Sequence, residues 1–181
     1  MADIEPKDVL DFWFAAGKEK WFVKDEAFDA EISTRFKEHH DAAKRWELDS
    51  WRETAQGCLA LIILLDQFGR NIYRGTADAF AADPKALALA RSMVEKSMDM
   101  ELPVDLRIWI YLPFEHSESM DDQERCIELL ERSGMEEFLK WAHLHADVIR
   151  EFDRFPHRNE ALGRTSTPEE IAFLEEGGFS G

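Results

Sequence analysis

The chain has 181 residues, of which 45% are hydrophobic and 33% are charged. This composition is typical of a folded domain of ordinary size and excludes a mostly disordered chain. There are 22 basic and 38 acidic side chains, which gives a net charge of −16. Non-specific binding to nucleic acid and docking on anionic membranes both need clustered positive charge, so we expect neither partner. The oligomeric state is left open.

Two further features of the sequence bear on its location. No apolar run is long enough to cross a bilayer, since the longest one, Cys58 to Leu65, is far too short. The N-terminal residues have neither the basic region nor the apolar core of a signal peptide. Cys58 and Cys126 make no disulfide framework and lie in apolar-rich stretches. We therefore expect a cytoplasmic protein with both cysteines reduced and in the core.

The hydrophobic periodicity is helical through the first half of the chain. Pro6 suits the first position of a short helix, and a longer helix begins near Asp25. The stripe of the longer helix repeats every three or four residues and comprises Phe28, Ile32, Phe36, His39, Ala43 and Trp46. Thr54 can cap a third helix, whose centre is apolar on every side. Such a helix belongs in the middle of the domain.

Helical signals continue through the second half. Asp83-Pro84 has the pattern of a cap followed by a first-position proline and opens a helix to about Met98. A helix over 121–133 stops at Gly134, and Thr167 begins a capping box before the last helix. Between them, a long helix carries a stripe of Met135, Phe138, Ala142, His145, Ile149 and Phe152.

One segment favours a different structure by composition. Residues 107–112 (RIWIYL) are rich in strand formers, but no partner strand is visible, and prolines at 103 and 113 bracket the segment. We interpret it as a short buried helix. The sequence thus predicts an all-α fold: a single domain over 1–181, made of antiparallel helices in an array similar to tetratricopeptide repeats around a central buried helix. The six tryptophans are expected either in its core or lining a groove, and the core is favoured.

Three clusters of polar residues are unlike ordinary solvated surface. The first follows the central helix and contains Asp66, Arg70 and Asn71. The second follows the RIWIYL segment and contains Glu115, His116 and Glu118. The third lies where the long helix ends and contains Arg154, His157, Arg158, Asn159 and Arg164. His145 lies in the apolar stripe of the long helix, shortly before the third cluster. It is either a core histidine whose hydrogen bonds are made within the core, or part of the same site as the third cluster.

The charges of these clusters are complementary, which leaves two main interpretations. In one, arginine forks hold buried carboxylates in a structural network. In the other, arginines and histidines form a pocket for a carboxylate or phosphate, with Glu115, His116 and Glu118 as acid–base candidates. A metal site is the weakest interpretation because HExxH and Cys-x-x-Cys motifs are absent. We predict no metal and no cofactor.

These clusters contain the long motifs LLDQFGRNIYRGTADAFAAD, LPFEHSE and RFPHRNEALGRTSTPEE. The chain also contains VLDFWF, an early WF and the spacing H-x-x-x-I-x-x-F from His145. Together these motifs resemble a bacterial family known as domain-of-unknown-function family 924. The resemblance covers nearly the whole chain and implies an all-helical fold similar to tetratricopeptide-repeat folds, with no established activity. Gly69 stands where the family usually has proline, and Asp153 where it usually has glycine.

Two functions remain open from the sequence. The first is a protein that binds a small anionic ligand, either as an enzyme or as a binding protein, with its site at the three clusters. The second is a helical adaptor that binds a peptide or a partner helix in a groove. A deep pocket at the clusters would favour the first, and an open groove lined by exposed aromatic side chains would favour the second.

Overall fold

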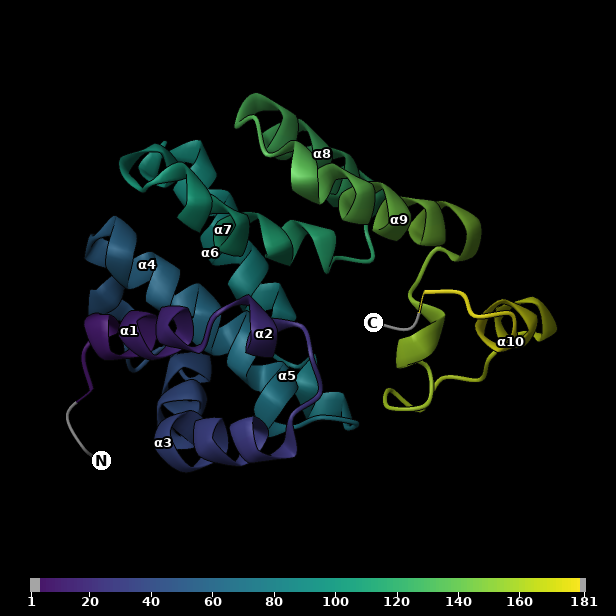
Figure 1. The fold of residues 1–181 in the computed structure, drawn as a ribbon, viewed down its shortest axis with the longest axis horizontal. Helices are drawn as coiled ribbons and strands as arrows, with labels where there is room; N and C mark the ends of the chain where they lie inside the picture. The colour runs from purple at the N-terminus through teal and green to yellow at the C-terminus, as the bar shows by residue number, and fades with distance from the viewer. Residues whose placement is uncertain (1–3, 180–181) are drawn as a thin grey trace. The chain divides into compact units, whose positions relative to one another are not determined.

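The computed structural model describes residues 4–179, which contain only helices and connecting segments and no strand (Figure 1). This confirms the predicted all-α class. The chain forms two compact units: unit 1 comprises residues up to 74 and 78–110, and unit 2 comprises 75–77 and 111–181. The division falls inside helix α7 (Val104–Glu115), which runs through it as one helix. The prediction of a single domain stays a prediction.

Unit 1 is built around one continuous helix. It begins as α4 (Ala55–Ile62), passes through the π-helical segment η2 (Ile63–Phe68) and ends as α5 (Gly69–Ile72). This helix packs against the other long helices of the unit, which are α1 (Pro6–Ala16), α3 (Glu26–Lys44) and α6 (Asp83–Glu95). Every residue from Cys58 to Leu65 is 5% exposed or less. The predicted central buried helix is therefore confirmed.

Short elements complete unit 1. They are α2 (Lys18–Trp21), η1 (Asp49–Glu53) and η4 (Met98–Glu101). The element η3 (Ala77–Ala79) begins at Ala77, the last residue of the 75–77 segment of unit 2, and its other two residues belong to unit 1.

Side-chain caps start the helices of unit 1 where the sequence indicates. The Asp25 carboxylate accepts hydrogen bonds from the first-turn backbone of α3, and Thr54 Oγ1 accepts one from the Gly57 N–H at 3.0 Å. At Gly57 the chain of η1 comes so close that an added Cβ would lie 2.0 Å from the Trp51 carbonyl oxygen. Only glycine fits there, so this close approach fixes how the central helix enters the core.

Two predicted helix boundaries are wrong. Asp83 is the first residue of α6 rather than its cap, because its carboxylate is held by Arg70, and α6 ends at Glu95 rather than near Met98. The helix over RIWIYL does not end at Pro113: α7 continues through this proline to Glu115. The helical interpretation of RIWIYL itself is confirmed.

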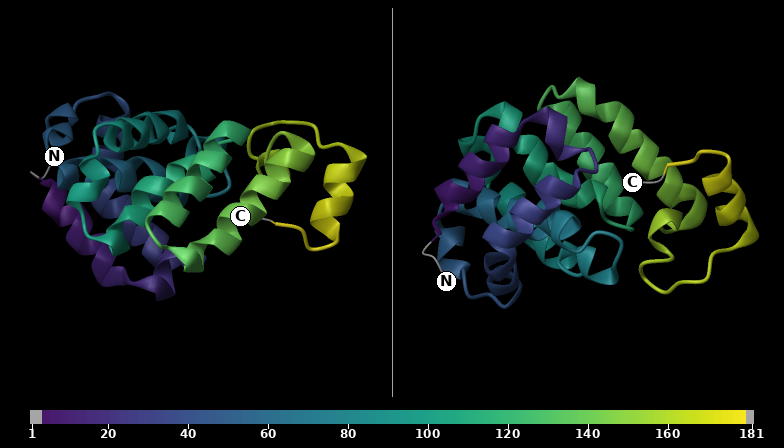
Figure 2. Two further views of the ribbon diagram at one scale, coloured as in Figure 1. Left: turned by 90° about the horizontal axis from the view of Figure 1, so that it is seen from above. Right: turned by 60° about the horizontal axis from the view of Figure 1, so that its bottom comes forward.

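Unit 2 contains a helical hairpin and a smaller C-terminal part. Helices α8 (Met120–Arg132) and α9 (Glu136–Phe152) lie side by side along their lengths (Figures 1 and 2). After them come η5 (Pro156–Arg158) and α10 (Pro168–Glu175), which contact each other. Thr167 and Glu170 form the predicted capping box of α10. An apolar cluster of Val148, Ile149, Phe155, Met120, Phe152, Phe173 and Phe179 forms a core.

The tryptophans divide between core and surface. Trp13 and Trp109 are at most 2% exposed, and their rings meet edge to face at 5.2 Å in unit 1. Trp46 and Trp141 are 49% and 50% exposed, so the expectation of a core position is wrong for both. Trp46 lies outside the apolar stripe because α3 ends at Lys44 and the backbone of Trp46 is left-handed, with φ of 66°. Both cysteines are buried, as predicted.

Candidate polar site in unit 2

The first polar cluster lies in unit 1 and is an ion-pair network. Asp66 is fully buried in the π-helical segment, where its carboxylate accepts a hydrogen bond from Gln67 Nε2 at 2.5 Å. Arg70 Nη1 lies 3.2 Å from Asp66 Oδ1, and the same guanidinium binds Asp83 with both nitrogens at 2.9 and 3.0 Å. The helix thus continues past Gly69, and Arg70 lies on the same face as Asp66.

Asn71 belongs to a neighbouring contact in unit 1. Its side-chain amide donates to Asp29 Oδ1 at 2.7 Å, and Arg74 binds the same carboxylate in a fork at 2.7 and 2.9 Å. Burial alone would raise the pKa of Asp29, but the hydrogen bonds from Arg74 and Asn71 outweigh it and lower that pKa. The sequence gives no signal for Asp29, which lies 42 residues from Asn71, and it indicates Asp83 only as a helix cap and not as a partner of Arg70.

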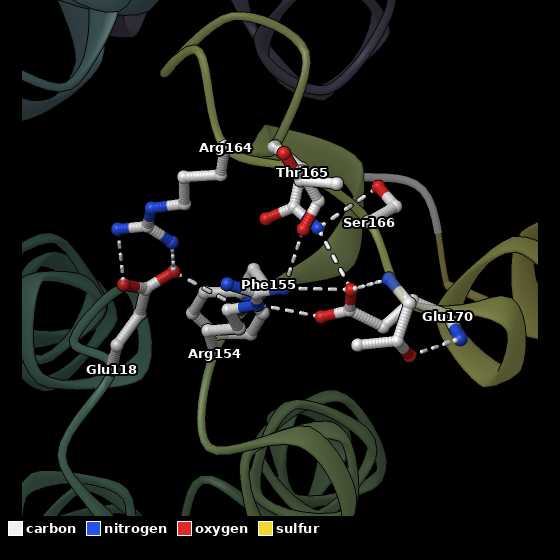
Figure 3. A network of polar contacts seen from close by, with 9 residues as sticks. Glu118, Arg154, Phe155, Arg164, Thr165, Ser166 and Glu170 are labelled. Atoms are coloured by element: carbon white, nitrogen blue, oxygen red, sulfur yellow. Dashed lines mark hydrogen bonds and ion pairs between the residues drawn. The ribbon is translucent and has the colours of Figure 1, made fainter.

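Two bidentate ion pairs tie the end of unit 2 together (Figure 3). Arg164 donates to both oxygens of Glu118 at 2.8 Å, and the Phe155 backbone N–H donates to one of them at 3.0 Å. Burial raises the pKa of Glu118, while the hydrogen bonds from Arg164 and Phe155 lower it by more, so that its pKa is below the usual range. Glu118 is therefore held as a carboxylate by its partners.

The second pair joins Arg154 to Glu170, at 2.6 and 2.8 Å. Glu170 also accepts from the Thr167 backbone at 2.7 Å and from Asn159 Nδ2 at 3.1 Å (Figure 3). These contacts, led by the Arg154 hydrogen bond, lower the pKa of Glu170 to about 2. The capping box was the one sequence signal for Glu170, and it gave no indication of the pairing with Arg154.

An open cleft of about 610 Å³ runs past this second pair. The residues that line the cleft include one guanidinium, that of Arg154, and four carboxylates. The carboxylates are those of Glu151, Asp153, Glu169 and Glu170. An anion in this cleft would meet net negative charge. The cleft therefore does not fit the anionic ligand that the sequence suggests.

His145 occupies a different environment in unit 2. The residue is 8% exposed, and its Nδ1 donates to the Trp141 carbonyl oxygen at 2.8 Å. Glu115 Oε1 lies 3.4 Å from the same nitrogen, and Glu115 is 4% exposed. The Nδ1 side of the ring is therefore fixed by a carbonyl oxygen and a carboxylate.

Other members of the second and third clusters surround this imidazole. The centre of the His116 ring lies 6.4 Å from the centre of the His145 ring. The centres of the Phe155 and Phe179 rings lie 5.7 and 4.3 Å from the same point. His157 contacts Phe179 at 5.3 Å, and the Arg158 guanidinium lies 4.4 Å from the centre of the Phe155 ring. We call Glu115, His116, His145, His157 and Arg158 the histidine cluster.

Burial and charge act together on the central ring. Burial is the largest cause that lowers the pKa of His145, and electrostatic interactions with His116, Arg158 and His157 lower it further. The hydrogen bond to Trp141 raises the pKa, but by less, so that the result is about 3. His145 is thus neutral at physiological pH.

The structure sorts the predicted site residues into three groups. Asp66, Arg70 and Asn71 make ion pairs and hydrogen bonds within unit 1. Glu118, Arg154, Asn159 and Arg164 belong to the two pairs of unit 2. Glu115, His116, His145, His157 and Arg158 form the histidine cluster. Over residues 4–179, no three His, Cys, Asp or Glu side chains come together as ligands for a metal ion. None of the described helices is both long and apolar enough to span a membrane.

Comparisons with known proteins give the family and the fold. The sequence model of a bacterial protein family of unknown function, DUF924, matches residues 9–178. A solved structure of ATU0120, a protein of unknown function from Agrobacterium tumefaciens, is 46% identical and superimposes with a TM-score of 0.90, covering 95% of this chain and 97% of that one. The search of curated proteins found no match to the chain. The match over nearly all its length means that this chain belongs to the DUF924 family of bacterial proteins.

Proposed function

We propose that unit 2 binds a small anion, a carboxylate or a phosphate, at the histidine cluster. The observation that carries this proposal is a buried imidazole whose protonation is disfavoured by a buried guanidinium. Arg158 is 6% exposed, and its positive charge is one of the causes that lower the pKa of His145. The same positive potential attracts an anion, and its effect is strong in a buried site.

The pair of Glu115 and His145 supports a role in proton transfer. Glu115 lies on the Nδ1 side of the ring, so that Nε2 is the nitrogen able to take a proton from a ligand. A carboxylate in that place stabilises the imidazolium that such a transfer forms. In this proposal Arg158 holds the anion, His145 accepts the proton and Glu115 orients the ring.

The proposal predicts stabilisation by ligand. A panel of small carboxylates and phosphates is added to the protein, and the melting temperature is followed by calorimetry. A ligand present at one hundred times its dissociation constant adds about 2.7 kcal/mol of stability. Arg158→Lys should lose most of that shift, because an ammonium does not reproduce the guanidinium fork.

Arg154→Lys is the matched control. Arg154 pairs with Glu170 outside the histidine cluster, so its replacement should lower the melting temperature of the free protein and leave the ligand shift intact. A panel in which no anion raises the melting temperature contradicts the proposal. So does a shift that survives in Arg158→Lys.

One observation in unit 1 favours an adaptor as the second candidate. Phe22 and Val23 are 63% and 56% exposed, and the Phe22 ring stacks on Trp109 at 5.9 Å. An exposed apolar pair on a rigid aromatic base suits an apolar peptide side chain. If this candidate holds, Phe22→Ala should weaken binding of amphipathic peptides at least tenfold, while the anion panel gives no shift.

A further inference from the structure

A small cavity lies in unit 1, and none of the residues that line it belongs to the three polar clusters. Its volume is about 190 Å³. Its walls come from η1, the start of α4, the second half of α6 and the turn that follows α6. Cavities for drug-sized ligands are larger, at about 300–1,000 Å³. A ligand that fits this cavity is therefore a small metabolite.

The buried part of the cavity lining is apolar. Leu89 and Met93 of α6 are 3% and 1% exposed, and Cys58 of α4 is 5% exposed. The Cys58 thiol donates to the Arg52 carbonyl oxygen at 3.4 Å, which holds the sulfur in place. Water is poorly held by such side chains, so its replacement by an apolar group is favourable. The buried end of the cavity thus suits an aliphatic side chain.

The remaining part of the lining carries charges of both signs. Arg52 and Lys96 are the cations, and Asp49 and Glu53 are the anions. Both cations act on Cys58: burial raises the pKa of its thiol most, and the charges of Arg52 and Lys96 oppose that rise. Two positive and two negative charges therefore surround one small cavity, and their sum is zero.

Only part of this charge is matched within the protein. Arg52 Nη1 lies 3.5 Å from Asp49 Oδ2, which is a long contact between partly exposed side chains. Among residues 4–179, the side chains of Glu53 and Lys96 form no hydrogen bond or ion pair. A carboxylate and an ammonium group are thus available to a ligand. A ligand with a single charge would meet one of them and be repelled by the other.

We propose that this cavity binds a small zwitterion, an α-amino acid with an aliphatic side chain. Such a molecule is the smallest that combines an anion, a cation and an apolar group. Its carboxylate binds Lys96, its ammonium group binds Glu53, and its side chain packs against Leu89 and Met93. The site lies in unit 1 and goes beyond the anion-binding function proposed for unit 2, so either can fail without the other.

Three ligands that share one side chain test the proposal. Leucine carries both charges, isocaproate lacks the ammonium group, and isopentylamine lacks the carboxylate. Each is titrated into the whole ¹⁵N-labelled chain, and the backbone amide resonances of the cavity residues are followed. About 0.15 M salt screens the general attraction of an amine to the acidic chain. We expect leucine to bind about tenfold more tightly than either analogue, because each analogue lacks one charge-assisted hydrogen bond.

Two variants identify the groups that recognise the charges. Lys96→Gln should remove the advantage of leucine over isopentylamine, and Glu53→Gln should remove its advantage over isocaproate. Lys24→Gln and Glu38→Gln are the matched controls, at exposed positions of unit 1 outside the cavity. They change the net charge by the same amounts and should keep both preferences. Circular dichroism checks that all four variants are folded.

The thiol in the cavity gives an independent measurement. Leucine should slow the alkylation of Cys58 by iodoacetamide, as followed by mass spectrometry of the peptides, whereas the two analogues at the same concentration should slow it less. Cys126 is fully buried and does not line this cavity, so it serves as the internal reference. Its labelling reports unfolding, and leucine should not change the ratio by that route.

The outcomes decide the proposal. Equal affinities of leucine and either analogue in the wild-type protein overturn it, because one of the two charges is then not recognised. Preferences that persist in both Lys96→Gln and Glu53→Gln overturn it as well, since other groups then meet the ligand. So does a titration in which leucine moves no resonance of the cavity residues. None of these results bears on the anion panel, whose variants lie in unit 2.

Discussion

Asp153 adopts a left-handed backbone at the end of α9, with φ of 57°, and its N–H donates to the Ile149 carbonyl oxygen at 2.8 Å. Helices commonly end in this way on glycine, which has no Cβ to strain the conformation. This geometry therefore suits glycine better than aspartate. The exposed carboxylate of Asp153 also adds negative charge to the cleft beside Arg154.

Asp153→Gly should therefore stabilise the protein. We expect a gain of up to about 1 kcal/mol in the free energy of unfolding, measured in urea, because the strain of a left-handed non-glycine residue is relieved. Lys140→Gly, at an exposed position within α9, should cost up to about 1 kcal/mol. Equal losses in the two variants would show that the conformation at 153 is not strained.

His145 should make stability depend on pH. Its pKa of about 3 in the folded protein lies below the ordinary 6.5, so the unfolded chain binds more protons between these values. Stability attributable to this ring is complete above pH 6.5 and falls as the pH decreases towards 3. The slope is up to about 1.4 kcal/mol per pH unit.

The measurement compares wild-type protein with His145→Phe in urea between pH 5 and 7. The variant should lose less stability in this window, and His143→Phe should behave as wild type. Glu118 and Glu170, whose pKa values are also lowered, act further down. Glu170 loses its contribution as the pH falls from about 4.5 towards 2, because its carboxylate must then be protonated. Glu118 loses its contribution below its ordinary pKa for the same reason. Parallel pH profiles of His145→Phe and wild type would contradict the assignment.

At the scale of elements, the π-helical segment η2 sets the position of Asp66 in the centre of unit 1. Such segments are rare and occur often at functional sites. Here the segment carries a fully buried carboxylate between Gln67 and Arg70. The buried charge is stable only with these partners.

Asp66→Ala should destabilise the protein by about 3 kcal/mol, as shown by the denaturant midpoint. Arg70 keeps its fork on Asp83, so the cost lies at the lower end of that for breaking a buried pair. Glu31→Ala, which removes an exposed pair with Arg35 at the same i,i+4 spacing, should cost about 0.5 kcal/mol or less. A midpoint for Asp66→Ala no lower than that of Glu31→Ala would mean that the carboxylate is dispensable.

Local signals predicted the helices well, because caps and periodicity act within one element. Asp25, Thr54 and Thr167 begin helices as expected. Pairing between elements is less predictable: the capping box indicates only the local contact of Glu170 with Thr167, although the main partner of Glu170 is Arg154, sixteen residues away. The π-helical geometry has no sequence rule of its own, and Pro113 is tolerated near the end of α7. The same reason limits the site: the sequence indicated its residues but not their division among three groups.

At the scale of the whole molecule, α7 passes through the division between the two units as one unbroken helix. Residues in one helix form and lose their hydrogen bonds cooperatively. We therefore expect a single thermal transition, with equal calorimetric and van't Hoff enthalpies. Two resolved transitions in the calorimeter would contradict the predicted single domain.

The distribution of tryptophan has a consequence for spectroscopy. Trp13 and Trp109 lie deep in unit 1, whereas Trp141, the tryptophan of unit 2, is half exposed in the folded state. A buried indole changes its emission on meeting water far more than one that is already wet. The change in intrinsic fluorescence on heating therefore reports mainly the melting of unit 1, and the melting of unit 2 changes it little. Ellipticity at 222 nm registers the helices of both, so the separation between the two curves measures how closely the units melt together.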